Sequence, residues 1–190
     1  MAAHRSVNVN LPNALTLGRI ALVPVFIWLY LAGGTGNRIA ATLVFMVAAA
    51  TDQLDGHLAR SRNLETDFGR IADPIADKAL VGAALVLLSA AHFVPWWVTI
   101  LILIRELGIT ALRFVMIRRQ VMAASKGGKL KTVTQMLFIW LLLIPWHGFV
   151  GQATADVVVT IAHVIMYVAL AITVLTGVQY CVDAYRIAHE

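Results

Sequence analysis

Six apolar stretches constrain the fold of this chain more than any other feature of its sequence. Hydrophobic residues fill 60% of the 190 positions and charged residues only 13%, about half the charged share of an ordinary soluble domain. A helix needs about 20 apolar residues to cross a bilayer, so a chain of this length has room for about six crossings and no separate soluble domain. We therefore predict an all-α integral membrane protein with six transmembrane helices and a single domain over residues 1–190. The apolar stretches are 14–32, 39–50, 71–91, 94–104, 133–145 and 155–180.

Two of these stretches, 39–50 and 94–104, are too short to span a bilayer alone. Polar sequence with helical character continues them through 51–60 and 105–118. We expect both helices to extend from the hydrocarbon into the interface. The tail after Asp156 carries few polar residues, and we assign it no site.

The basic residues lie on one side of these expected spans. The connectors 33–36, 91–93 and 147–151 contain no Lys or Arg, and every one of the fifteen basic residues except Arg38 falls on the opposite side. By the positive-inside rule, that side and both termini are cytoplasmic. The net charge of +5 is spread over helix ends and short connections, which favours anionic lipid headgroups or phosphorylated substrates as partners and argues against nucleic acid.

Four aspartates form the constellation that carries chemistry. Asp52 and Asp55 are three residues apart, and Asp73 and Asp77 are four apart. On a helix each pair projects from one face, so two consecutive helices present four carboxylates. Such a group near a bilayer is unfavourable unless cations or shared protons neutralise it. Oxygen ligands without a Cys or His pair indicate a hard cation, Mg²⁺ or Mn²⁺, and two such ions can clamp a phosphoryl group.

Small and basic residues flank these aspartates. Gly56 and Ala59 leave the helix face beside Asp55 nearly bare, so that a flat ligand can lie against it. Gly69 lets the second helix begin close to a ligand or to its neighbour, although small residues in membrane helices also serve helix packing. Arg60, at the expected cytoplasmic end, can meet phosphate oxygens or act as a topological anchor.

The complete pattern, Asp52-x2-Asp55-Gly56-x2-Ala59-Arg60-x8-Gly69-x3-Asp73-x3-Asp77, resembles the signature of the CDP-alcohol phosphatidyltransferase family. Every fixed position is filled. Further segments are similar to those of the bacterial phosphatidylglycerophosphate synthases in that family, and the similarity extends to about Met136. These segments are Pro12-Asn13-x-Leu15-Thr16-x2-Arg19, Asp73-Pro74-x-Ala76-Asp77-Lys78, Arg105-Glu106 and Gly128-Lys129-x-Lys131-Thr132.

The resemblance implies a six-helix fold, a homodimer and an active site open to the cytoplasm of a bacterial inner membrane. CDP-diacylglycerol is then the donor, with its cytidine near Asp52, Gly56 and Ala59 and its diphosphate near Arg60. The first helix contributes Asn13, Thr16 and Arg19 to the nucleotide pocket, although Arg19 can instead snorkel to the interface. By the same analogy Asp52, Asp55 and Asp73 hold metal, and Asp77 is a ligand or the general base.

The acceptor implied by the resemblance is sn-glycerol 3-phosphate, which needs cationic partners for its phosphate. Five residues supply them on the expected cytoplasmic side. Arg105 can also form an internal ion pair with Glu106, and the others can serve only to set topology. The five residues are Arg105, Arg113, Arg118, Lys129 and Lys131.

Two alternatives to this interpretation remain. One is a sister enzyme of the same family that makes cardiolipin, phosphatidylinositol phosphate or phosphatidylserine, and so differs only in the acceptor. The other is an ion or proton transporter whose carboxylates form a coupling site at the membrane midplane. The position of the aspartates beside Arg60 and Arg70, at helix ends, and the absence of an inverted repeat argue against a transporter.

Overall fold

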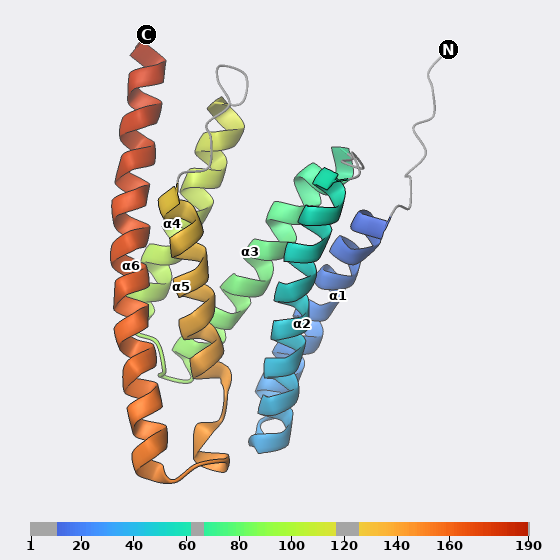
Figure 1. Ribbon diagram of the computed structural model, residues 1–190, viewed down its shortest axis with the longest axis vertical. Helices are drawn as coiled ribbons and strands as arrows, with labels where there is room; N and C mark the ends of the chain where they lie inside the picture. Colours follow the sequence, from blue (N-terminus) through green and yellow to red (C-terminus); the bar gives the residue numbers. More distant parts are fainter. Residues whose placement is uncertain (1–10, 62–66, 117–125, 190) are drawn as a thin grey trace. The chain divides into compact units, whose positions relative to one another are not determined.

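The part of the chain that the structure describes consists of helices joined by short turns (Figure 1). The computed structural model describes residues 11–61, 67–116 and 126–189, and within them the side chains of 14–51, 75–112, 128 and 130–186. These ranges contain six α-helices, one short 3-10 turn and no strand, which confirms the all-α prediction for them. The elements are α1 (Leu11–Ala32), α2 (Gly34–Ser61), α3 (Asp67–Ala90), α4 (Trp96–Met116), α5 (Lys126–Leu143), η1 (Trp146–Gly148) and α6 (Gln152–His189).

Several helices extend beyond the apolar stretches that predicted them. The polar continuations are helical, since α2 runs to Ser61 and α4 to Met116. Helix α6 has 38 residues, so at a rise of 1.5 Å per residue it is about 57 Å long, well beyond the roughly 30 Å of a bilayer core. Helix α5 ends at Leu143, two residues before Pro145, because a residue that precedes proline avoids the α conformation.

Two of the helices are long and apolar enough to cross a bilayer. They are the segments Ala14–Ala32 of α1 and Gln152–Arg186 of α6. In α5 the apolar segment Leu130–Leu143 is shorter. The prediction of six spans therefore stays a prediction.

The structure divides into two compact units, Met1–Ala84 and Leu85–Glu190, which are described separately. In the first unit α1 packs against α2 (Figure 1). Gly33 and Gly34 have positive φ angles of 70° and 75°, which glycine adopts without steric cost, so the chain reverses between the two helices within one residue. Phe26 of α1 contacts Phe45 of α2 with ring centroids 5.7 Å apart, and the guanidinium of Arg38 donates to the Tyr30 hydroxyl at 2.8 Å.

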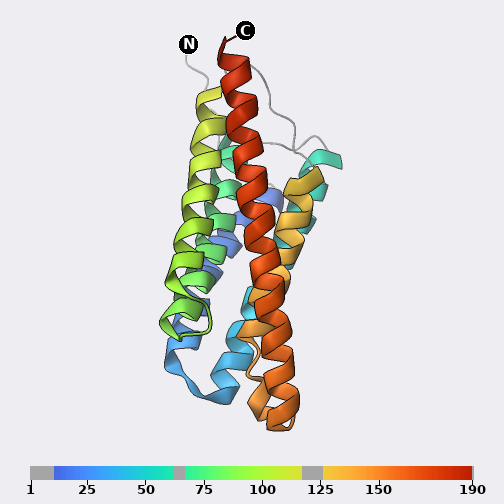
Figure 2. The same ribbon diagram turned by 90° about the vertical axis from the view of Figure 1, so that its left-hand side faces the viewer.

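In the second unit α6 packs against both α4 and α5. Figure 2 shows α6 with α4 on one side and α5 on the other. The turn between α3 and α4 has His92 in the left-handed conformation, and Phe93 N–H donates to Leu88 O at 2.9 Å, which is a Schellman end. The imidazole Nε2 of His163 lies 2.8 Å from Phe93 O and fixes this turn to α6. The turn that precedes α4 is thereby held against α6 at His163.

Candidate functional site

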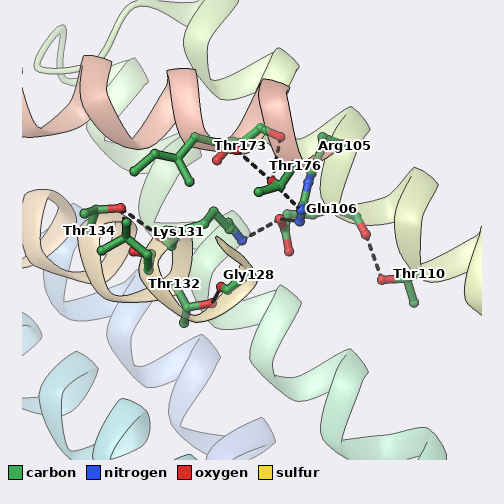
Figure 3. A network of polar contacts seen from close by, with 11 residues as sticks. Arg105, Glu106, Thr110, Gly128, Lys131, Thr132, Thr134, Thr173 and Thr176 are labelled. Carbon is green, nitrogen blue, oxygen red and sulfur yellow. Dashed lines mark hydrogen bonds and ion pairs between the residues drawn. The ribbon is translucent and has the colours of Figure 1, made fainter. Parts of the chain in front are cut away.

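A cluster of charged side chains joins α4, α5 and α6 in the second unit (Figure 3). Arg105 Nη1 donates to Glu106 Oε1 at 2.9 Å, and Lys131 Nζ donates to the same oxygen. Arg105 Nη2 donates to Thr176 Oγ1, also at 2.9 Å. We call Arg105, Glu106, Lys131 and Thr176 the cationic cluster. It brings together two of the five residues predicted to bind the acceptor phosphate.

Helix α6 shapes the position of Arg105. A Cβ atom on Gly177 would lie 3.2 Å from Arg105 Cγ, so glycine allows the arginine stem to cross the helix closely. The guanidinium carbon lies 5.9 Å from the centroid of the Tyr180 ring, within the range of a cation–π interaction. Thr176 is held in turn, because its hydroxyl donates to Ile172 O at 2.7 Å. Arg105 is therefore fixed by hydrogen bonds, packing and an aromatic face.

The charged side chains of the cluster are largely buried. The side chains of Arg105, Glu106 and Lys131 are only 14%, 15% and 7% exposed. Removing charges from water is costly, and an ion pair repays this cost only with good geometry and further hydrogen bonds. Glu106 supplies one carboxylate to two cations, and two neighbouring cations are suited to a ligand such as a phosphate.

The four aspartates of the motif all lie on helices of the first unit. Asp52 and Asp55 lie within α2, and Asp73 and Asp77 lie within α3, which is helical through Pro74. The prediction that each pair occupies one helix is confirmed, whereas the kink at Pro74 stays a prediction. Asp77, the one member of the four whose side chain is described, is half-buried. Among the described side chains, no group of three His, Cys, Asp or Glu residues is placed to hold a metal ion. The described side chains do not include those of the other three aspartates.

Thr16 and Arg19 form part of the buried face of α1. Both side chains are 1% exposed, and Arg19 is among the largest fully buried side chains described. The three-residue spacing puts them on one face with Phe26, which packs against α2. Arg19 therefore points into the protein, and the alternative that it snorkels to the interface is wrong.

The comparisons with known proteins agree with the motif. A family model described as CDP-alcohol phosphatidyltransferase matches residues 9–175. The chain belongs to the CDP-alcohol phosphatidyltransferase family. It is 47% identical to a probable phosphatidylglycerophosphate synthase of Mycobacterium tuberculosis, over 93% of this chain and 82% of the relative. It is 38% and 41% identical to proteins of Bacillus subtilis and Escherichia coli named CDP-diacylglycerol–glycerol-3-phosphate 3-phosphatidyltransferase, over 90% of this chain and 93% and 92% of theirs.

Membership of the CDP-alcohol phosphatidyltransferase family identifies the chain as a membrane-associated transferase. The transporter alternative is thereby set aside, because the family is one of phosphatidyltransferases. The family match covers both units, from before α1 to residue 175 in α6. The recognition made from the motif is confirmed.

Most of the other predicted site residues lie outside the described side chains. Arg118 falls in the range 117–125, which the structure does not describe. The remaining residues lie on described helices, but their side chains are not among those that the structure describes, so their roles stay predictions. They are Asn13, Asp52, Asp55, Gly56, Ala59, Arg60, Gly69, Asp73, Arg113 and Lys129.

The sequence interpretation missed the contribution of α6. It assigned no site to the tail after Asp156, yet Thr176 and Tyr180 hold Arg105. The available signal was a polar and small stripe at helical spacing, namely Thr173, Thr176, Gly177 and Tyr180. The ion pair between Arg105 and Glu106, considered from the sequence, is present, but Glu106 also binds Lys131.

We predict that Glu106→Gln lowers the free energy of unfolding more than Lys131→Gln does. The first change leaves two buried cations without their carboxylate, which costs about 3 kcal/mol or more. The second leaves the neutral pair of Arg105 and Glu106 intact. Thermal unfolding in detergent measures both, with Asp183→Asn, an exposed acidic residue of α6, as the control. Equal shifts for the two cluster variants would show that Glu106 is not the shared counter-ion.

Proposed function

We propose that this enzyme transfers the phosphatidyl group of CDP-diacylglycerol to sn-glycerol 3-phosphate, releasing CMP and phosphatidylglycerophosphate. The names of relatives that share 38% to 47% of its residues support both substrates. The structural observation that carries the choice of acceptor is the cationic cluster. Its two buried cations, Arg105 and Lys131, suit a small phosphorylated alcohol better than one without a phosphate, such as serine.

The membrane arrangement is part of this proposal. All six helices cross the cytoplasmic membrane of a bacterium, both termini are cytoplasmic, and residues 1–190 act as one domain in a homodimer. Two apolar helices and the one-sided distribution of basic residues support the arrangement. The active site then opens to the cytoplasm, where glycerol 3-phosphate is dissolved.

The helix register of the first unit supports a donor site made by α1 and α2. The contacts of Tyr30 with Arg38 and of Phe26 with Phe45 show that the helices are antiparallel. Both helices continue unbroken toward the other end. At equal rise per residue this register brings the buried Arg19 level with the turn of α2 that begins near Asp52. Thr16 and Asn13 follow toward the turns that carry Gly56, Ala59 and Arg60.

The metal site comprises Asp52, Asp55, Asp73 and Asp77. The donor set fits a hard cation, because it offers only carboxylate oxygens from two helices. Two bound ions, Mg²⁺ or Mn²⁺, would supply neutralisation of the charge on the donor diphosphate. Arg60 and Gly69 flank these aspartates on α2 and α3 and bind the diphosphate and the nucleotide.

Asp77 serves as the general base. Its half-buried carboxylate accepts the proton of the acceptor hydroxyl while the hydroxyl oxygen forms a bond to the lipid-side phosphorus. The bond from that phosphorus to the oxygen of CMP breaks, and CMP leaves with the electron pair. Arg60 stabilises the negative charge on this leaving group.

The cationic cluster holds the acceptor phosphate. Arg105 uses one hydrogen bond from each terminal nitrogen within the cluster, so a second N–H on each remains for phosphate oxygens. Glu106 orients both cations and prevents them from repelling each other. Arg113, Arg118 and Lys129 extend the positive surface around this phosphate.

The purified enzyme should release CMP from CDP-diacylglycerol when Mg²⁺ and glycerol 3-phosphate are present. Inositol phosphate, serine and phosphatidylglycerol are the competing acceptors, and Asp73→Asn is the inactive control. Release that depends on another acceptor would move the enzyme to a sister activity of the same family. No release with any acceptor would contradict the proposal.

Asp77→Asn should keep binding of the CDP-lipid and lower turnover by about 10² or more, because the amide cannot accept the proton. Single-turnover CMP release and equilibrium binding of the donor measure the two effects. Asp183→Asn is the matched control, since Asp183 is exposed on α6. Unchanged turnover in Asp77→Asn would remove this residue from the mechanism.

Lys131→Gln should raise the KM of glycerol 3-phosphate by about tenfold or more, the equivalent of one charge-assisted hydrogen bond. The KM of the donor should change little. Steady-state kinetics with each substrate varied in turn gives both values, and Arg186→Gln, at an exposed position of α6, is the control. Equal effects on the two KM values would exclude Lys131 from the acceptor pocket.

A further inference from the structure

Three buried polar atoms in the second unit have no hydrogen-bond partner among the described residues. They are Arg105 Nε, Gln135 Oε1 and Thr173 Oγ1. Each comes from a different helix, α4, α5 and α6 respectively. Gln135 is 3% exposed and Thr173 is 1% exposed, so water at the surface does not satisfy them.

Arg105 belongs to the cationic cluster, and Gln135 and Thr173 each lie one helical turn from residues at the cluster. Gln135 follows Lys131 by one turn of α5, and Thr173 precedes Gly177 by one turn of α6. Arg105 Nε is 3.8 Å from the position of a Cβ on Gly177. Figure 3 shows Thr173 beside Thr176 and close to Arg105. Three helices thus each carry an unsatisfied polar group within or one helical turn from the cluster.

The next turns of α5 and α6 are apolar. Phe138 and Ile139 follow Gln135 on α5, and Ala169 and Leu170 precede Thr173 on α6; all four are buried. A buried polar group without a partner costs about 1–3 kcal/mol, and more in apolar surroundings that lack water. The three groups together therefore carry a large penalty that a bound polar molecule would relieve.

The chemistry of the three atoms matches a hydroxyl group. Gln135 Oε1 accepts a hydrogen bond, Arg105 Nε donates one, and the Thr173 hydroxyl does either. An alcohol both donates and accepts, so it can satisfy an acceptor and a donor at once. A second phosphate would meet the acceptor Gln135 Oε1 unfavourably, and an apolar group would leave all three unpaired.

We propose that Gln135, Thr173 and Arg105 Nε form a subsite that binds the non-reacting hydroxyl of a phosphorylated polyol acceptor. The subsite rests on the proposed function, because it assumes that the cationic cluster holds the acceptor phosphate. It adds the group that distinguishes a polyol phosphate from a simple hydroxyalkyl phosphate. A site built to hydrogen-bond a hydroxyl rejects the analogue that lacks it, because its own buried groups are then left unpaired.

The test compares sn-glycerol 3-phosphate with 3-hydroxypropyl phosphate, which keeps the phosphate and the terminal hydroxyl but lacks the central one. CMP release by the full-length enzyme gives kcat/KM for each. The wild-type enzyme should prefer glycerol 3-phosphate by about 10² or more. In Thr173→Val and in Gln135→Met this preference should fall at least about tenfold, because only the reaction of glycerol 3-phosphate is weakened.

Matched variants separate recognition from structure. Thr160→Val and Gln152→Met alter exposed positions of α6 and should keep the wild-type preference, as should Thr173→Ser, which retains the hydroxyl. If these residues have only a structural role, or bind a water molecule instead of the substrate hydroxyl, the variants lower kcat/KM equally for both substrates. The preference is then unchanged. That result, or a wild-type enzyme without preference, overturns the subsite alone.

Failure of the proposed function has a different signature. If the wild-type enzyme releases no CMP with glycerol 3-phosphate but does so with another acceptor, the proposed function fails and the subsite fails with it. Thr173 and Gln135 lie on different helices. If one of the two variants does not fold, the other still tests the subsite.

Discussion

The neutralisation of buried charge governs the second unit of this enzyme. Arg105 and Lys131 lie on different helices, and each is largely removed from water. The carboxylate of Glu106 holds both, and it thereby ties α4 to α5, while Thr176 ties Arg105 to α6. An apolar helix bundle offers few other ways to bury two cations, since an unpaired charge in such surroundings is far more costly than an ion pair. The packing of three helices and the candidate acceptor site therefore depend on the same contact.

The first unit must also neutralise charge, but there most of the charged groups are negative. Four aspartates lie on α2 and α3, and a buried arginine lies on α1. Apolar and aromatic contacts between α1 and α2, such as that of Phe26 with Phe45, position these charged turns without forming part of the chemistry. Each unit thus has an apolar part that provides rigidity and a charged part that suits phosphate. An enzyme that joins a lipid donor to a dissolved, anionic acceptor needs both kinds of environment.

Binding of the acceptor requires both affinity for its phosphate and selectivity for its alcohol part. Charge attracts phosphate but does not distinguish among small alcohol phosphates, because every such molecule carries the same group. Selectivity needs neutral hydrogen-bonding groups near the cations, and the unpaired oxygen atoms of Gln135 and Thr173, one helical turn from the cluster, are such groups. Charge therefore supplies affinity, and neutral groups supply selectivity. The physical reason is desolvation: a substrate without the matching hydroxyl leaves a buried donor or acceptor unpaired, and this costs free energy.

The sequence by itself determined the helical class, the aspartate pairs on single helices and the family, because composition, helical spacing and a fixed motif are local properties of the chain. It also offered an ion pair between the neighbours Arg105 and Glu106 as one of two interpretations, the other being a substrate role for Arg105. Only the tertiary structure decided that Lys131 shares Glu106, that α6 supplies Thr176 and Tyr180, and that Arg19 is buried. Arg105 and Thr176 are 71 residues apart, and no local pattern specifies which turns of two distant helices meet. That choice depends on side-chain packing across the whole unit, where Gly177 admits the arginine stem and a larger residue would displace it.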